Sequence, residues 1–273
     1  MAVTMAEISK LRTMTGAGMM DCKNALTEAN GDMDQAIELI RKRGQAIAAK
    51  RSDRQASEGC VLAASNGEFA AVVAIKCETD FVAQNADFIA LTQSILDAAM
   101  ANKVADKESL LALAIDGRSI ADLITDRSGI TGEKMELGFY EVVNGAATVA
   151  YIHPGNKLAT VVAFNEALDA QVAREVAMQV AAMNPIAVKR DEVPANIIAT
   201  ELEVGREKAR QEGKPEAMLD KIAEGRLNKF YKESTLLEQD FIKDAKVSVQ
   251  QYLKQVSASL TATAFKRVTL NEE

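Results

Sequence analysis

Residues Gly59 to Asn85 have the sequence GCVLAASNGEFAAVVAIKCETDFVAQN and contain a strand pattern followed by the start of a helical one. Its apolar residues alternate with period two around Asn66-Gly67, a dipeptide that fits a tight turn because both residues tolerate positive φ. This pattern predicts a β-hairpin that ends at Cys77. The apolar residues after Asn85 are spaced instead as on a helix of about four turns, which Asn85 can cap; they are Phe88, Leu91, Ile95, Leu96 and Ala99.

The heptapeptide TDFVAQN, Thr79 to Asn85, therefore occupies the loop between the second strand and this helix. An acid beside an aromatic suits insertion into another protein, because the ring of Phe81 can anchor in an apolar slot while Asp80 perturbs an ion or phosphate beyond it. A structural interpretation is also open, in which Thr79 or Asp80 caps the next helix and Phe81 is its first core contact. Spacing alone favours this structural interpretation.

The carboxyl half repeats the strand and helix pattern. Antiparallel strands are predicted at Met135–Val143, Ala147–Ile152 and Leu158–Phe164, with a turn at Asn144-Gly145, and a helix from about Asp169 to Met183 follows. An internal duplication is the natural hypothesis, with two subdomains that each carry a small sheet covered by a helix. The predicted fold class is α+β.

The amino-terminal residues from Met5 to about Lys50 predict three short helices. Gly16 to Gly18 ends the first, Asn30-Gly31 ends the second, and Asp32 can cap the third. Met19 and Met20 stand at the start of the second helix, where thioethers suit a partner surface, although methionine at helical spacing is as often a core residue.

A basic stretch, Arg41 to Glu58, follows this module and has the sequence RKRGQAIAAKRSDRQASE. We expect it to be a linker, helical at its start, because a run of charges usually forms a solvated face.

The segment Pro194 to Lys232 is charged and is divided by Gly213-Lys214-Pro215, which predicts a projecting helical hairpin. A helix at Val247–Val256 and a strand at Leu260–Thr269 follow, and the strand is expected to return to the second sheet. The apolar residues that would face one another in the hairpin are Ile198, Leu202, Gly205, Ala209, Leu219, Ile222, Ala223 and Phe230.

Composition limits the class of protein. A chain of 273 residues predicts about two or three domains. Its net charge of -7, with both signs mixed, argues against direct nucleic-acid binding. Cys22, Cys60 and Cys77 lack CxxC spacing, so we expect small buried residues in a reducing cytosol rather than disulfides or a zinc cluster. No signal peptide and no apolar run of about 20 residues is present, which favours a soluble, cytoplasmic protein without a membrane partner.

Catalytic motifs are missing from the sequence. His153 is the single histidine, and HExxH, GxSxG and GxxxxGK[ST] do not occur, so we expect no enzyme, no bound nucleotide, no cofactor and no metal. Cys77 with His153 could formally make a nucleophile pair, but no third group to orient it is indicated.

Four segments resemble one family. TDFVAQN is similar to the TDFVA(K/R)N signature of bacterial elongation factor Ts, the guanine-nucleotide exchange factor for elongation factor Tu. LRTMTGAGMMDCKNALTEANGDMDQAI, Leu11 to Ile37, resembles that family's LRxxTGAGMMDCKKAL opening. AYIHPGNKLATVVAF, around His153, and GKPEAMLDKIAEGRLNKFYKE, Gly213 to Glu233, match two further motifs. The sequence ends soon after Leu270, so we expect the extra terminal module of some members to be absent.

The resemblance implies a domain plan. Residues 1–54 would form a three-helix domain like the ubiquitin-associated domain, together with its linker, and residues 55–135 a first core subdomain. Residues 136–190 and 234–273 would form a second core subdomain. Residues 191–233 would be an inserted coiled-coil hairpin, used in contact with a partner or in a homodimer.

The resemblance also implies residue roles. Thr79, Asp80, Phe81 and Val82 would displace Mg²⁺ from elongation factor Tu and so promote loss of GDP. A second set would contact the GTPase elsewhere; it comprises Arg12, Met19, Met20 and His153. The rival hypothesis is a non-catalytic adaptor that recruits partners through the three-helix module and the hairpin.

Overall fold

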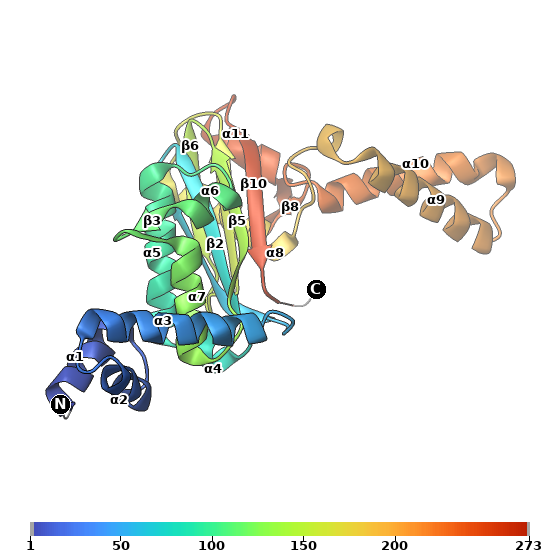
Figure 1. Ribbon diagram of the computed structural model, residues 1–273. Coiled ribbons are helices and arrows are strands. Elements are labelled where there is room, and N and C mark those ends of the chain that lie inside the picture. The colour runs from blue at the N-terminus through green and yellow to red at the C-terminus, as the bar shows by residue number, and fades with distance from the viewer. Residues whose placement is uncertain (1–2, 272–273) are drawn as a thin grey trace. The chain divides into compact units, whose positions relative to one another are not determined.

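The computed structural model describes residues 3–271 and confirms an α+β fold (Figure 1). The described parts of Met1–Leu62, Val73–Glu141 and Leu270–Glu273 form one compact unit, unit 1. Ala63–Val72 and Val142–Thr269 form unit 2. Two three-stranded sheets have the strand orders β1-β2-β5 and β10-β7-β6. None of the described helices is both long and apolar enough to span a bilayer.

Unit 1 begins with the three predicted helices, which are α1 (Met5–Thr15), α2 (Met19–Glu28) and α3 (Met33–Lys50). Asp32 caps α3, as expected, by accepting a hydrogen bond from the amide of Gln35 at 2.9 Å. The helices enclose one small core, whose buried residues are Ile8, Leu11, Ala17, Cys22, Ala25, Leu26, Ala29 and Ala36.

The helical start predicted for the stretch from Arg41 is confirmed, but the expectation that its first half is a solvated linker is wrong. Helix α3 continues to Lys50 and packs against α7 (Ile120–Thr131), with Gly44 buried at the contact. Successive residues of a helix are about 100° apart, so exposed Lys42 and buried Gly44 point in nearly opposite directions. A charged run can therefore also carry a packed face.

The first sheet begins with the predicted hairpin of β1 (Glu58–Ser65) and β2 (Phe69–Cys77). Its turn differs from the expectation, because positive φ occurs at Gly67 and not at Asn66. The amide of Asn66 donates to the carbonyl of Phe69 at 3.0 Å, so Gly67 and Glu68 are the central residues. Glycine at the first central position is typical of a type II′ turn. The third strand of this sheet is β5 (Glu136–Asn144), which we had expected in the second sheet.

Helix α5 (Ala86–Asn102) confirms the predicted helix after TDFVAQN. Asn85 caps it, since its side-chain oxygen accepts hydrogen bonds from the amides of Asp87 and Phe88. No pattern in the sequence predicts structure in the next segment. It contains α6 (Lys107–Ala112), the short strands β3 (Ala114–Ile115) and β4 (Arg118–Ser119), and α7.

Unit 2 contains the second sheet, in which β6 (Ala147–Ile152), β7 (Leu158–Phe164) and β10 (Ala262–Thr269) confirm the predicted strands. Strand β7 lies between the other two and pairs antiparallel with both. Helix α8 (Ala170–Met183) packs on β6 and β7, with Val176 and Val180 buried. The internal duplication stays a hypothesis.

The second core is completed by elements near the carboxyl end. Helix α11 (Val249–Val256) was predicted, whereas the hairpin of β8 (Asp240–Phe241) and β9 (Asp244–Ser248) was not. Buried side chains from β7, α8, β8, α11 and the segments that connect them form one cluster, which includes Phe164, Val176, Leu236, Phe241, Leu253 and Leu260.

The predicted helical hairpin is present as α9 (Ala195–Gln211) and α10 (Leu219–Ser234). The 3₁₀ turn η1 (Arg190–Glu192) precedes α9, and the 3₁₀ turn η2 (Glu216–Met218) lies between the two helices. Figure 1 shows the two helices running side by side. A β-carbon at Gly205 would lie 3.1 Å from the Cα of Ala223, so small residues allow the close approach. The role of this arm, and the division of the chain at residues 54, 135, 190 and 233, stay predictions.

Candidate functional site

The segment Thr79–Asn85 connects β2 to α5 through a single helical turn, α4 (Asp80–Ala83). Thr79 caps this turn, with its hydroxyl oxygen accepting a hydrogen bond from the amide of Val82 at 3.4 Å. A helix of four residues cannot be stable by itself, because one turn fixes several dihedral angles for a single hydrogen bond. Contacts outside α4 must therefore hold it.

Phe81 projects into solvent from α4. Its exposed fraction is 84%, whereas Phe88, on the first turn of α5, is 1% exposed. The structural interpretation of the loop was therefore half right: Thr79 is a cap, but Phe88 and not Phe81 makes the core contact. Asp80 is exposed beside Phe81, Val82 is half-buried and Ala83 is buried. The acid and the ring are thus both accessible to a partner.

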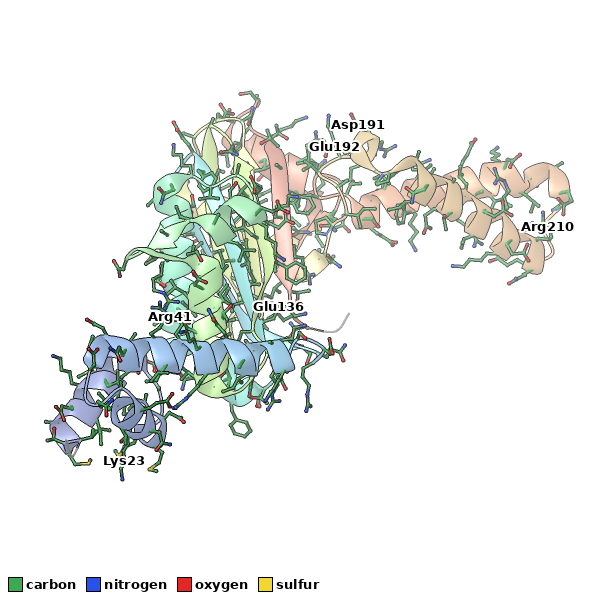
Figure 2. The ribbon with its side chains drawn as sticks, viewed as in Figure 1. Lys23, Arg41, Glu136, Asp191, Glu192 and Arg210 are labelled. Carbon is green, nitrogen blue, oxygen red and sulfur yellow. The ribbon has the colours of Figure 1, made fainter. Side chains whose placement is uncertain are left out.

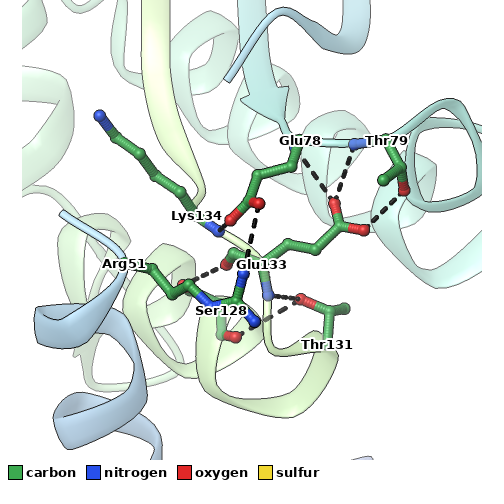
Figure 3. Close-up of polar contacts among 7 residues, drawn as sticks. All are labelled: Arg51, Glu78, Thr79, Ser128, Thr131, Glu133 and Lys134. Atoms are coloured by element: carbon green, nitrogen blue, oxygen red, sulfur yellow. Dashed lines mark hydrogen bonds and ion pairs between the residues drawn. The ribbon is translucent and has the colours of Figure 1, made fainter. Parts of the chain in front are cut away.

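Glu133 holds the start of the loop (Figure 3). One carboxylate oxygen accepts hydrogen bonds from the amides of Glu78 and Thr79, both at 3.1 Å. The other oxygen accepts a hydrogen bond from the hydroxyl of Thr79 at 2.6 Å. Hydrogen bonds to a carboxylate are stronger than those between neutral groups, so the residues before α4 are tightly fixed.

Glu78 in turn binds the backbone of the segment that contains Glu133. Its carboxylate accepts a hydrogen bond from the amide of Lys134 at 2.7 Å and lies 3.4 Å from the guanidinium of Arg51, just after α3. Glu133 is itself held at the end of α7, where the hydroxyl of Ser128 donates to its carbonyl oxygen. Glu78 and Glu133 thus connect two segments that are distant in the sequence, because the carboxylate of each accepts hydrogen bonds from backbone amides of the other segment.

Cys77 lies directly before Glu78 in the chain and is fully buried. Its thiol donates to the carbonyl oxygen of Thr79 at 3.3 Å. Burial raises the pKa of the Cys77 thiol to about 12, with the carboxylates of Glu133 and Glu58 adding to the effect. The thiolate is therefore scarce at neutral pH, which disfavours a role as nucleophile. Cys22 and Cys60 are buried as well, in agreement with the prediction of small buried residues.

The amino-terminal module presents exposed methionines. Met19 and Met20, on the first turn of α2, are 48% and 63% exposed, and Arg12 on α1 is exposed too. Figure 2 shows sulfur atoms beside Lys23, which is also on α2. Met14 is exposed as well and was missed by the sequence analysis. The core alternative for Met19 and Met20 is therefore wrong.

His153 lies in unit 2, in the turn between β6 and β7, and is exposed. Its Nδ1 atom is 3.0 Å from the hydroxyl of Tyr151, and its amide donates to the carbonyl of Leu158 at 2.9 Å. The guanidinium of Arg174 stands 5.2 Å from the centre of the Tyr151 ring. The structure thus brings Thr79–Val82 together on one loop, whereas the other predicted contact residues lie on separate elements.

No metal site emerges from the described residues. They contain no group of three or more His, Cys, Asp or Glu side chains placed to bind a metal ion. A cavity of about 640 Å³ within unit 1 is lined by both apolar and charged side chains of the module and α7, such as Ile40, Arg41, Asp126 and Ile130. None of the predicted site residues lines this cavity.

Comparison with known proteins gives the family. The family model for elongation factor TS matches residues 78–272. Elongation factor Ts of Porphyromonas gingivalis is 63% identical over 274 residues, and that of Azobacteroides pseudotrichonymphae is 56% identical over 274 residues. Elongation factor Ts of Phocaeicola vulgatus is 48% identical over 330 residues, and all three alignments cover 100% of both chains. The chain therefore belongs to the elongation factor Ts family and is a translation elongation factor.

Proposed function

We propose that this chain is a guanine-nucleotide exchange factor that binds the GTPase elongation factor Tu in its GDP form and promotes GDP release, so that GTP can reload. The observation that carries this proposal is the exposure of Phe81 on a turn that Glu133 fixes from outside. Covering an exposed aromatic ring with a partner's apolar surface lowers the free energy of the complex. The exposed position of Phe81 therefore favours insertion into another protein.

The loop supplies the residues that act on the bound magnesium and nucleotide. Phe81 enters an apolar slot of the GTPase, which brings Asp80 and Val82 toward the region where Mg²⁺ bridges the phosphates. Mg²⁺ requires nearly ideal octahedral coordination and tolerates displacement poorly. Thr79 contributes through the loop geometry, because its hydroxyl is engaged by Glu133 and by the amide of Val82.

Exchange by binding is a thermodynamic coupling: the factor weakens nucleotide binding by the same ratio as nucleotide weakens binding of the factor. Each tenfold effect requires about 1.4 kcal/mol. Burial of Phe81 supplies roughly 1.5 to 3 kcal/mol, which is too little for a large acceleration. Contacts elsewhere must stabilise the nucleotide-free GTPase, and we assign them to Arg12, Met19, Met20 and His153.

The proposal includes no chemical step on this chain, which acts by binding and needs no cofactor. Its site of action is the cytoplasm, where translation elongation takes place. The arm formed by α9 and α10 serves contact with the GTPase or with a second copy of the chain. No direct contact with nucleic acid or membrane is part of the mechanism.

Stopped-flow release of a fluorescent GDP from elongation factor Tu tests the proposal. Phe81→Ala and Asp80→Ala should slow the factor-stimulated release strongly while the proteins stay folded. Phe139→Ala is a matched control, because Phe139 is also exposed, at 42%, but lies on β5 outside the loop. Unchanged release rates in both loop variants would defeat the proposal.

A non-catalytic adaptor would also bind the GTPase, so binding alone does not separate the two hypotheses. Exchange requires the affinity to fall when GDP and Mg²⁺ saturate the GTPase, because the coupling is reciprocal. A pull-down with and without excess GDP and Mg²⁺ measures this difference. Equal capture under both conditions would favour the adaptor.

A further inference from the structure

We propose that Glu133 is a positioning residue of the exchange reaction, which holds Phe81 in the orientation that the GTPase meets. This inference rests on the proposed function, because it assigns to Glu133 an effect on the release of GDP. Glu133 itself is half-buried behind the loop. It acts through the geometry of the residues that precede α4.

The hydroxyl of Thr79 has one proton to donate and two lone pairs. It donates that proton to the carboxylate of Glu133 at 2.6 Å, so its lone pairs remain to accept from the amide of Val82. Without the carboxylate, the proton is free to turn toward other acceptors. Glu133 thus sets the hydroxyl in the orientation that caps α4.

The loop that carries Phe81 is held at its two ends. Four residues of helix do not hold their shape alone, and Phe81 has almost no packing contact of its own, being 84% exposed. The far end is fastened at Asn85, whose amide donates to the carbonyl of Val82 at 3.0 Å and whose side chain caps α5. The near end is fastened by Glu133. Fixing both ends before the partner arrives reduces the entropy lost on binding.

Glu133 is itself fixed by hydrogen bonds to its neighbours. The amide of Glu133 donates to the hydroxyl of Thr131 at 3.3 Å, and the hydroxyl of Ser128 donates to its carbonyl. Glu78 strengthens the same connection through its hydrogen bond from Lys134. The loop is therefore held on the carboxyl end of α7, a helix that packs against α3.

The primary test is a double-mutant cycle on GDP release at subsaturating factor. Glu133→Ala should lower the apparent second-order rate about tenfold, the effect expected when the ordering of roughly one residue is lost. In the Phe81→Ala background the same substitution should have almost no further effect. Glu136→Ala is the matched control, since Glu136 is a nearby carboxylate that pairs with Lys76 and Lys134 instead.

Conservative variants sharpen the assignment. Thr79→Ser keeps the hydroxyl and should retain activity, whereas Thr79→Val has nearly the same shape without a donor and should behave like Glu133→Ala. Glu133→Gln keeps one acceptor oxygen and should lie between the wild type and Glu133→Ala. Melting curves for each variant verify that the protein is folded.

A second readout does not depend on exchange. The chain contains no tryptophan, so Phe81→Trp introduces on α4 a single tryptophan, which can be excited selectively beside the four tyrosines. Adding Glu133→Ala should lower its fluorescence anisotropy, because the turn gains local motion. If Phe81→Ala leaves GDP release unchanged, the proposed function fails, yet the anisotropy still decides whether Glu133 fixes the loop. Additive rate effects in the cycle, or unchanged anisotropy, would overturn the assignment of Glu133.

Discussion

Gly44 and Gly129 bring the backbones of α3 and α7 into direct contact. A β-carbon at residue 129 would lie 2.1 Å from the Cα of Gly44 and 2.8 Å from its carbonyl carbon, closer than atoms can approach. A β-carbon at residue 44 would lie 3.4 Å from the Cα of Gly129, an ordinary contact distance. The same crossing therefore requires glycine on α7 but not on α3.

Gly129→Ala should consequently destabilise the protein by roughly 1 to 3 kcal/mol, the usual range for overpacking a contact that cannot widen freely. Gly44→Ala is the matched substitution at the other side of the crossing. It should be neutral or stabilise by up to about 1 kcal/mol, because alanine favours the helix. Urea denaturation followed by circular dichroism gives both values, and similar destabilisation by the two variants would contradict the asymmetry.

Substitutions of Phe81, within TDFVAQN, and of Phe88, just after it, should differ sharply in their effect on the free energy of unfolding. Phe81→Ala is expected to change the free energy of unfolding by less than about 0.5 kcal/mol, since an exposed ring makes few contacts. Phe88→Ala should cost roughly 3 to 5 kcal/mol, because it empties a buried site. Thermal melts of the two variants side by side provide the comparison. A large loss in Phe81→Ala would mean that the ring is packed inside.

Local patterns were sufficient to predict elements whose apolar spacing and caps agree. The hairpin of β1 and β2, the cap of α5 by Asn85, and the strands β6 and β7 all belong to this class. The segment between α5 and β5 was left unassigned for a physical reason. Its two-residue strands and six-residue helix depend on tertiary contacts, and α7 contains Gly129, a poor helix former, at its packed face.

The site was predictable only in part. The loop Thr79–Asn85 was located from its sequence, but the spacing that suggests a cap cannot decide whether Phe81 points inward or outward. Glu133 was missed altogether, because it lies 54 residues from Thr79 and no local pattern links the two. Glu78 likewise reaches Lys134 across 56 residues. Contacts of this kind arise from the fold and leave no periodic signal.

Cys77 should resist alkylation in the folded protein. Its pKa is raised to about 12, mainly by burial, so the reactive thiolate is rare at pH 8. Iodoacetamide should modify it at least roughly 100-fold more slowly than an exposed thiol such as that introduced by Ser52→Cys. Mass spectrometry measures both rates. Stimulated GDP release should survive the treatment, whereas its loss on mild alkylation would point to a cysteine-dependent activity.

Glu175 should make the stability of unit 2 sensitive to acid. Its carboxylate accepts hydrogen bonds from Lys243 at 2.6 Å and from Tyr252 at 2.5 Å, and these partners lower its pKa to about 2 from an ordinary value near 4.5. A carboxylate with a lowered pKa stabilises the folded state above the unfolded pKa, and this contribution disappears as the pH falls through the folded pKa. The stabilisation is therefore complete above about pH 5 and lost between about pH 4.5 and pH 2.

Glu175→Gln should accordingly lower the free energy of unfolding by roughly 1 to 2 kcal/mol at pH 7, and the difference from the wild type should shrink steadily below about pH 4.5 and approach zero only near pH 2. Glu233→Gln is a suitable control, because its carboxylate pairs with Lys229 on the exposed face of α10. Urea denaturation between pH 7 and pH 3 measures both differences. A penalty for Glu175→Gln that stays constant over this range would show that the lowered pKa contributes nothing to folding, and that Glu175 acts by packing alone.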